Sequence, residues 1–342
     1  MLNIDFLNSN QNLFSHIQKN YVFDNVTVST KTGPYRSLPL LSNPQGSIIP
    51  ETLDEPLYWH PSPLPLGRAQ VEVEADIEFR KKLFKSYYDE HQLSSSKCLE
   101  IDSKCVWLGH SHGWYPYGHL HDSLSRLFGI RNLLEDTNLT FLCSNWNRVT
   151  DFHDHLNACV GREVNKKSII RINDYDLIKC SQLIFSLPSS AATNFTKECQ
   201  EWLHSSYLSH FKIEYDAACR RPLYLSRNHV VPGKRGVKNE TELLEFLSQF
   251  KPKILYGTES LREIVDAFHH ASFIVGPHGS LLANTIFCRE DCLVIEYCAS
   301  NRIDKSFLNK QKYASNYHQV ITEADEDYNI FIDISDLSGF IM

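Results

Sequence analysis

The sequence predicts an α/β protein built from two units in tandem. From residue 105 onward, short apolar segments alternate with segments whose apolar residues recur at helical spacing. This alternation is typical of parallel sheets covered by helices. A helix predicted over residues 196–211 separates the alternating elements into two groups. We therefore expect two α/β domains with a cleft between them, and ligands at the carboxyl ends of the strands.

The composition indicates a globular protein and argues against some partners. The chain has 342 residues, of which 42% are hydrophobic and 22% are charged, as is usual for globular proteins. Its formal net charge of −7 argues against a nucleic-acid-binding protein, which is usually basic. The same charge provides no electrostatic attraction to an anionic membrane.

The sequence also bears on location. Residues 1–6 do not form a basic segment followed by an apolar one, so no signal peptide is expected. There is no apolar run of about 18 residues, the length that a transmembrane helix needs. The 10 cysteines form no CxxC pair and are expected to be reduced, packed thiols. We expect a cytoplasmic protein, with peripheral association with a membrane left open.

The first unit follows a long irregular section. Prolines interrupt residues 39–65, and such a section has few regular elements. Four short apolar segments then read as strands, and two segments with helical periodicity read as helices. The predicted strands span residues 105–109, 139–143, 168–172 and 182–185, and the predicted helices span residues 120–128 and 151–159.

The second unit contains more strands and helices, two of which begin at a recognisable cap. Asn239 with Glu242, and Ser260 with Glu263, have the spacing of capping boxes. For Ser260 a helix cap is the preferred interpretation over a phosphate contact. The predicted strands span residues 221–227, 253–256, 273–275, 293–297 and 330–334, and the predicted helices span residues 239–250, 260–268 and 280–288.

The stretch from residue 273 to residue 287 is the most informative part of the second unit. It opens as an apolar strand, breaks at Gly276-Pro277-His278-Gly279 and resumes at Ser280 as an apolar helix. A helix that starts directly after a glycine turn presents unpaired backbone N–H groups, which attract phosphate. A simple strand-to-helix turn of an α/β domain is the alternative interpretation.

Charged residues stand at the ends of other predicted strands of this unit. Arg227 follows one strand and Arg235 lies in the loop after it. Both guanidinium groups are suited to bidentate binding of phosphate oxygens, and the N–H groups near Gly279 and Ser280 could bind the remaining charge. Glu296 lies at the end of the following strand, where a carboxylate commonly accepts hydrogen bonds from ribose hydroxyls. For each arginine alone, a solvated or salt-bridged surface residue is the alternative.

The first unit contains a histidine-rich loop. Its polar and aromatic residues are His110, His112, Trp114, Tyr115, Tyr117, His119, His121 and Asp122. Imidazole and carboxylate groups together suit zinc or a di-metal hydrolase. Alternatively, one of these groups is a general base beside an aromatic platform for a sugar ring. A third interpretation is that His119 and Asp122 cap the following helix.

Four ordered segments of the second unit resemble the motifs of glycosyltransferase family 61. They are Leu-Tyr-Leu-Ser-Arg at residues 223–227, Arg-Gly-Val-Lys-Asn-Glu at 235–240, Gly-Pro-His-Gly-Ser-Leu-Leu-Ala-Asn at 276–284 followed by Phe287, and Val-Ile-Glu at 294–296. The chain departs from the family at Ser280 and Leu281, where members commonly have Ala-Gly. The resemblance covers residues 221–297.

The first unit also resembles this family. Its members often have a His, an acidic residue four places on, and then Leu-Pro-Arg-Leu. In this chain Asp122 fits the acid and Leu-Ser-Arg-Leu at residues 124–127 fits the end, while Gly118 stands where the His is expected. The resemblance therefore implies Asp122 as the catalytic base, with His119 and His121 as alternatives.

The resemblance implies a GT-B-like fold, in which two Rossmann-like domains face each other across a cleft. Residues 1–205 would form the N-terminal, acceptor-side domain and residues 206–342 the C-terminal, nucleotide-sugar-binding domain. The implied activity is an inverting hexosyl- or pentosyltransferase that uses a UDP-sugar, a glycan or other hydroxyl acceptor and no metal cofactor, in the synthesis of surface glycans or polysaccharides. The implied nucleotide-sugar site comprises Arg227, Arg235, Ser260, His278, Gly279, Ser280, Asn284 and Glu296.

Two other functions compete with this hypothesis. A metal-dependent hydrolase would use the cluster between His110 and Asp122, and would contain bound metal and be inhibited by a chelator. A non-catalytic module that binds nucleotide sugars or glycans would bind the donor without hydrolysing it. Binding of UDP, measured as thermal stabilisation, is the observation that the glycosyltransferase hypothesis requires.

Overall fold

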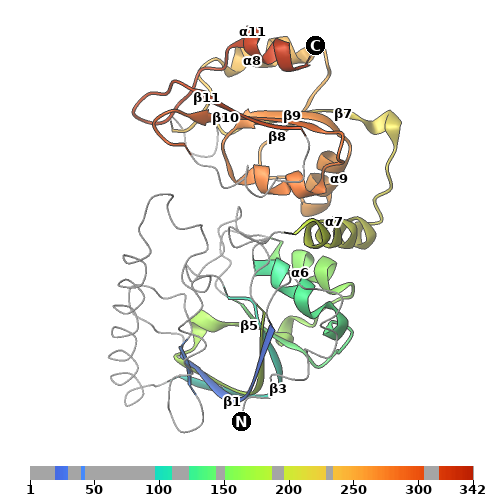
Figure 1. The fold of residues 1–342 in the computed structure, drawn as a ribbon, viewed down its shortest axis with the longest axis vertical. Coiled ribbons are helices and arrows are strands. Elements are labelled where there is room, and N and C mark those ends of the chain that lie inside the picture. Colours follow the sequence, from blue (N-terminus) through green and yellow to red (C-terminus); the bar gives the residue numbers. More distant parts are fainter. Residues whose placement is uncertain are drawn as a thin grey trace. The chain divides into compact units, whose positions relative to one another are not determined.

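The computed structural model describes residues 20–29, 40–42, 97–109, 123–143, 151–186, 196–228, 234–303 and 316–341. The chain divides into two compact units, Met1–Leu203 and His204–Met342. Each unit contains one sheet with parallel strands (Figure 1). These sheets and the helices between their strands confirm the predicted α/β class. In the described ranges, no helix has the length and apolarity needed to span a membrane.

The sheet of the first unit has the strand order β2-β1-β6-β3-β4-β5. The strands are β1 (Asn20–Ser29), β2 (Leu40–Ser42), β3 (Cys98–Trp107), β4 (Thr140–Cys143), β5 (Ile169–Arg171) and β6 (Leu177–Ser186). Strands β6, β3, β4 and β5 are parallel neighbours, whereas β1 runs antiparallel to β2 and to β6. The carboxyl ends of the four parallel strands therefore meet at one edge of the sheet.

Strand β3 changes character along its length. Residues 98–104 alternate between exposed and half-buried, whereas Cys105, Val106 and Trp107 are buried. A strand that starts at the surface and ends in the core shows an apolar run only at its buried end. For this reason the predicted strands at residues 105–109 and 182–185 are confirmed as the ends of two strands of 10 residues each.

Short helices connect the strands of the first unit. They are η4 (Ser125–Leu133), α6 (Phe152–Val160), η5 (Lys166–Ser168) and η6 (Ile172–Asp174), where η denotes a 3₁₀ helix. Helix α6 confirms the prediction and ends at Gly161, whose φ of 76° is the left-handed conformation that glycine adopts without a steric penalty. Leu124, Leu127 and Phe128 are buried as predicted, although the helix there is mainly of the tighter 3₁₀ type.

The sheet of the second unit is fully parallel and has the order β11-β10-β9-β7-β8. Its strands are β7 (Arg221–Leu225), β8 (Lys253–Leu255), β9 (Ala271–Pro277), β10 (Leu293–Ala299) and β11 (Tyr317–Thr322). Numbered from the first strand of this unit, the spatial order is 2-1-3-4-5. Because the order reverses between β7 and β9, the two strands open a crevice at their carboxyl ends, where sheets of this type bind ligands.

Helices cover both faces of this sheet. The helices α8 (Glu240–Ser248), α9 (Leu261–His269), η8 (Ser280–Phe287) and α11 (Ile334–Ile341) connect or follow its strands, whereas α7 (Lys197–Phe211) and η7 (Ala217–Cys219) precede the first of them. In Figure 1, α8 and α11 lie over one face and α9 lies over the other. Leu243 of α8 and Leu337 of α11 are fully buried, in one apolar cluster with Tyr224, Val275 and Ile295 of the sheet. The central strands β7, β9 and β10 are buried along most of their length, as parallel strands covered on both faces must be.

The predicted break of the strand at Gly276 is wrong, because β9 continues through Gly276 and Pro277. Both residues are in register with β10, opposite Glu296 and Tyr297. A Cβ atom at position 276 would lie 2.8 Å from the Cβ atom of Leu225, so the glycine permits the close approach of β7 and β9. The last register pair of β9 with β7 is at Val275, so the missing N–H of Pro277 leaves no ladder bond unmade.

Three other local predictions need correction. The segment after Gly279 is a 3₁₀ helix rather than an α-helix. Asn239 precedes α8 but makes no side-chain cap, because its side-chain oxygen accepts from the N–H of Ile332 and its amide donates to the carbonyl of Ile332. The segment at residues 330–334 forms isolated bridges and leads into α11, and the edge strand is β11 instead.

Candidate functional site

The candidate site lies where the strand order of the second unit reverses. Arg227 lies two residues beyond the end of β7, and His278 and Gly279 follow β9. Because β7 and β9 are parallel neighbours, these residues meet at the same edge of the sheet. The structure thus brings together two of the segments that the sequence singled out separately.

Arg227 lies against the backbone of Gly279. A Cβ atom at position 279 would collide with the Nη1 atom of Arg227 and would lie 3.0 Å from its Cδ atom. Gly279 has a φ of −177°, which is extended backbone open to any residue, so space and not conformation requires the glycine here. The guanidinium group is thereby held at the start of η8.

Arg227 is a largely buried cation with two other arginines nearby. Its Nε atom is buried without a hydrogen-bond partner in the described part of the chain. Burial, followed by the nearby positive charges of Arg235 and Arg302, lowers the pKa of Arg227 to about 10. Since the group is still protonated at neutral pH, an anionic ligand would relieve both the desolvation and the repulsion.

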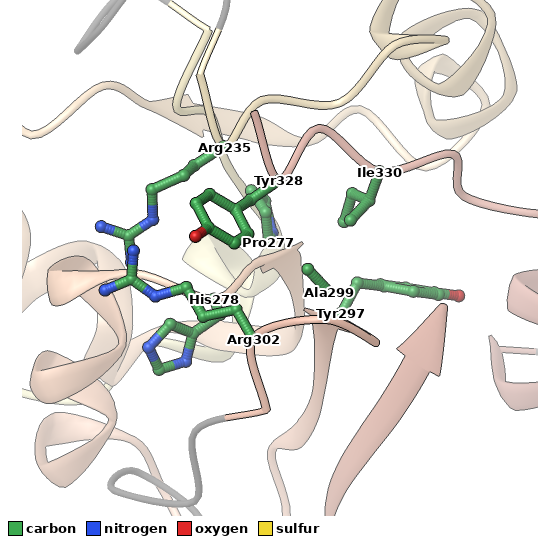
Figure 2. Close-up of a pocket in the computed structure, with 8 residues that line it drawn as sticks. All are labelled: Arg235, Pro277, His278, Tyr297, Ala299, Arg302, Tyr328 and Ile330. Atoms are coloured by element: carbon green, nitrogen blue, oxygen red, sulfur yellow. The ribbon is translucent and has the colours of Figure 1, made fainter. Parts of the chain in front are cut away.

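A pocket opens at the carboxyl ends of β9 and β10 (Figure 2). The cavity is small, about 20 Å³, and is partly open to solvent. Its lining residues are Arg235, Pro277, His278, Tyr297, Ala299, Arg302, Tyr328 and Ile330. In Figure 2 the guanidinium groups of Arg235 and Arg302 lie on the same side of the pocket as the imidazole of His278. This side of the pocket is suited to an anion.

Two of the lining residues hold a backbone conformation that non-glycine residues rarely adopt. Arg235 has a φ of 59° and Tyr328 a φ of 62°, both in the left-handed region, where such residues are commonly found at ligand sites. The N–H of Arg235 donates to the carbonyl of Asp327, which joins the two strained segments. The guanidinium of Arg302 lies over the ring of Tyr328, 5.4 Å from its centroid.

The loop at residues 324–330 is tied down by side-chain hydrogen bonds. The Oδ1 atom of Asp325 accepts from the N–H groups of Asp327 and Asn329, and Asn329 in turn accepts from the N–H of Gly236. Lys238 pairs with Asp325, and this hydrogen-bonded pair, more than any other contact, lowers the pKa of Asp325 to about 2. Together, these hydrogen bonds stabilise the left-handed backbone conformation of Arg235 and Tyr328 beside the pocket.

Glu240 holds the residues that precede and follow Arg227 in the chain. Its Oε1 atom accepts from the hydroxyls of Tyr224 and Ser226, and its Oε2 atom from the amide of Asn228. Asn228 also accepts from the N–H of Val237. The residues around Arg227 are thus fixed on α8 and on the loop of Arg235. Glu240 belongs to a segment that the sequence singled out, but the sequence assigned it no role.

Glu296 and His278 form a buried pair. The Oε1 atom of Glu296 lies 2.6 Å from the Nδ1 atom of His278, and the Oε2 atom accepts from the hydroxyl of Tyr317 and the amide of Gln319. The Glu296 side chain is 0% exposed and that of His278 is 11% exposed. Since both oxygens of Glu296 are engaged, the geometry supports a contact with His278 rather than with a ribose hydroxyl.

The remaining predicted residues of this unit have varied surroundings. Ser260 forms the predicted capping box with Glu263 at the start of α9, which confirms the helix-cap interpretation. Asn284 is fully buried and donates to the carbonyl of Leu281, so it stabilises η8 from within. Ser280 is exposed at the start of η8. Of these three, Ser280 is the one placed to reach a ligand.

The proposed catalytic half of the site lies elsewhere in the chain. His119, His121 and Asp122, together with His110 and His112, lie outside the described residues. Within the described ranges, no three His, Cys, Asp or Glu side chains gather as metal ligands would. The base and the metal-site alternative therefore stay predictions.

Arg302 and Tyr328 are the site residues that the sequence interpretation missed. Arg302 lies three residues beyond the end of β10, which is Ala299. The rule that ligands bind beyond the carboxyl ends of parallel strands selects this position once β10 is known to extend to Ala299. Tyr328 gives no comparable signal, because only the folded loop brings it to the pocket.

The fold and the site define an α/β protein with a cationic pocket at the carboxyl edge of a parallel sheet, a site suited to an anionic ligand. The family model described as Glycosyltransferase 61 matches residues 117–295, slightly more than half of the chain. The chain belongs to this glycosyltransferase family. The match includes Arg227, Arg235 and His278 and ends one residue before Glu296. A search of curated proteins found no significant match.

Proposed function

We propose that this protein is an inverting glycosyltransferase that transfers a sugar from a UDP-sugar to a hydroxyl of a glycan acceptor. The observation that carries the proposal is the buried cation Arg227 at the strand-order reversal. Arg227 is held against Gly279, its Nε atom has no partner in the described part of the chain, and Arg235 and Arg302 add positive charge. Such a site is complementary to a diphosphate.

The same cations suit the chemistry of sugar transfer. As the bond to the anomeric carbon breaks, negative charge develops on the departing diphosphate. Arginine side chains fixed beside that position stabilise the charge without reorganisation, in a partly desolvated environment. We therefore propose a mechanism in which Arg227, Arg235 and Arg302 supply this stabilisation and no metal ion is needed.

The other parts of the proposal rest on the family resemblance. A base near the start of η4 takes the proton of the acceptor hydroxyl, and Asp122 is the first choice, followed by His119 and His121. The two α/β units form a GT-B-like pair of domains. The enzyme acts in the cytoplasm, in the synthesis of surface glycans or polysaccharides.

A thermal-shift panel of UDP, other nucleoside diphosphates and their sugar conjugates tests the donor assignment. UDP is expected to raise the melting temperature, because a ligand that binds only the folded state stabilises it. Arg227→Ala is expected to reduce this shift, and to lower turnover of the donor about 10²–10³-fold at saturating donor. Arg221→Ala is the matched control, since Arg221 is exposed at the opposite end of the same strand.

The outcomes separate the competing functions. No stabilisation by any nucleotide would contradict the proposal. Stabilisation by UDP without hydrolysis or transfer of any UDP-sugar in the panel would favour the non-catalytic binding module. Stoichiometric zinc together with chelator-sensitive hydrolysis would favour the metal-dependent hydrolase.

A further inference from the structure

We infer that His278 is the general acid that protonates the departing diphosphate once the donor is bound, and that Glu296 is the positioning residue that orients His278 and favours its protonated form. The inference rests on the proposed function, since it requires a diphosphate in the pocket. It assigns a proton-transfer role to a residue that would otherwise only contact the donor. Its basis is the geometry of the buried pair and the arrangement of charges around it.

The contact between the two side chains fixes which ring nitrogen faces which partner. The Nδ1 atom of His278 lies 2.6 Å from the Oε1 atom of Glu296, so Nδ1 carries a proton and donates it to the carboxylate. The backbone N–H of His278 donates to the carbonyl of Tyr297, which holds the residue beside β10. Because Nδ1 is committed to Glu296, Nε2 is the nitrogen through which His278 acts on a ligand in the pocket that it lines.

Glu296 is surrounded by donors. Its side chain is fully buried, and a buried carboxylate is stable in its charged form only when donors surround it. Here the second oxygen accepts from Tyr317 and Gln319 of β11, while the first faces His278. An ionised carboxylate in this position favours the imidazolium form of His278, in which Nε2 also carries a proton.

The arginines around the pocket oppose that protonation until a ligand arrives. Arg302 after β10 and Arg235 in the loop after β7 line the pocket with His278, and Arg227 lies against the neighbouring Gly279. These positive charges disfavour an imidazolium ion in the empty site, whereas the negative charge of a bound diphosphate offsets them. Donor binding and protonation of His278 are thus coupled, and the acid is ready when the donor is bound.

The proton-transfer step balances. The acceptor oxygen forms a bond to the anomeric carbon, and the bond from that carbon to the β-phosphate oxygen breaks with its electron pair left on the phosphate. The acceptor proton passes to the catalytic base. The Nε2 proton of His278 passes to the β-phosphate oxygen, and the neutral imidazole regains a proton from solvent after release of the nucleotide.

Calorimetric titration of the full chain with UDP in buffers of different ionisation enthalpy measures the coupling. Wild-type protein is expected to take up protons on binding UDP, and its affinity for UDP is expected to fall by up to tenfold per pH unit above the pKa of His278. Glu296→Gln and His278→Gln are each expected to reduce the uptake and to flatten the pH dependence. Two variants are used because Glu296 is buried, and its replacement could impair folding.

Asp266→Asn is the matched control. Asp266 faces the Nδ1 atom of His270 at 3.3 Å, and this carboxylate–histidine pair lies at the other end of β9, where the strand begins. The control is expected to leave proton uptake unchanged. A purely structural role for Glu296 would lower stability but would leave the proton uptake per bound UDP as in the wild type.

The outcomes distinguish this inference from the proposed function. If UDP binds and the uptake is the same in wild type, Glu296→Gln and His278→Gln, the inference is overturned while the donor assignment stands. If UDP does not bind the wild-type protein, both fail. As a kinetic check, His278→Gln is expected to lower kcat more than it changes KM, and its pH profile is expected to lose the limb at high pH.

Discussion

The guanidinium group of Arg227 occupies the space that a side chain at position 279 would need. The two residues lie 52 positions apart in the sequence and follow different strands, β7 and β9. Their contact places the buried cation where η8 begins. The relationship explains why a glycine stands at position 279, although its φ of −177° is open to any residue.

Gly279→Ala is expected to weaken UDP binding strongly with little effect on stability elsewhere in the unit. The added methyl group would displace the guanidinium group of Arg227 from the start of η8. Because that group is the end of a flexible side chain, the substitution is expected to lower UDP affinity more than the free energy of unfolding. The change in the UDP-induced thermal shift measures the effect.

Gly339→Ala is the control for this substitution. Gly339 lies in α11 and a Cβ atom there would meet nothing within 4 Å. Alanine in a helix interior is expected to stabilise the protein by about 0.5–1 kcal/mol, with UDP binding unchanged. Equal UDP binding by wild type and Gly279→Ala would contradict the assigned role of the Arg227–Gly279 contact.

Arg302→Gln is expected to weaken UDP binding about tenfold, since a hydrogen bond to a charged group contributes about 1.5–3 kcal/mol. The loss should shrink as the salt concentration rises, because charge drives the interaction. Isothermal titration at two salt concentrations checks both points. Arg289→Gln is a matched control, because Arg289 lies over the ring of Tyr215 at 4.0 Å in the way that Arg302 lies over Tyr328. An unchanged affinity in Arg302→Gln would remove Arg302 from the site.

The stability of the protein is expected to fall below neutral pH because of His269. Burial, followed by the positive charges that His204 and His270 would carry, lowers the pKa of His269 to about 4, and the residue is 6% exposed. The unfolded chain therefore binds a proton near pH 6.5 that the folded chain does not bind until about pH 4. Stability should decrease as the pH falls through this window, by about 2 kcal/mol from pH 7 to pH 5.

Urea unfolding of the wild type and of His269→Gln at pH 7 and pH 5 measures this contribution. The variant is expected to be less stable at pH 7 but to lose less stability on acidification. His318→Gln serves as the control, since His318 is exposed on β11. The same loss between the two pH values in His269→Gln and wild type would assign the acid sensitivity to other groups.

Ser260→Ala separates a helix cap from a phosphate contact. In the structure the Ser260 hydroxyl accepts from the N–H of Glu263, and the Glu263 carboxylate accepts from the N–H of Ser260. Loss of the cap is expected to cost about 1 kcal/mol of stability, measured by urea unfolding, and to leave UDP affinity unchanged. A substantial loss of UDP affinity would show that Ser260 reaches the ligand after all.

Much of the second unit could be predicted from the sequence, because its strands are buried on both faces. Strands β7, β8, β9 and β10 each contain an uninterrupted apolar segment, which is the sequence signal of a parallel strand. Strand β11 reads Tyr-His-Gln-Val-Ile-Thr and is mostly half-buried or exposed. As an edge strand it needs only one apolar side, so its sequence carries little signal.

The site was predictable in part for a related reason. Arg227, Arg235 and His278 follow strands, and the position after a strand can be read from the chain alone. Arg302 and Tyr328 could not be identified, because their approach to the pocket depends on the path of β10 and of the loop at residues 324–330. The pairing of Glu296 with His278 likewise depends on β9 and β10 lying next to each other.

By itself, the sequence determined the α/β class, the order of the strands along the chain, the capping box at Ser260 and the family. The class and the strands follow from local periodicity, and the capping box and the family follow from motifs and their order. The tertiary structure decided the spatial order of the strands, with its reversal between β7 and β9. It also decided that Glu296 pairs with His278 and that Arg227 packs against Gly279. These relationships arise from burial and from contacts between distant residues, which local sequence does not encode.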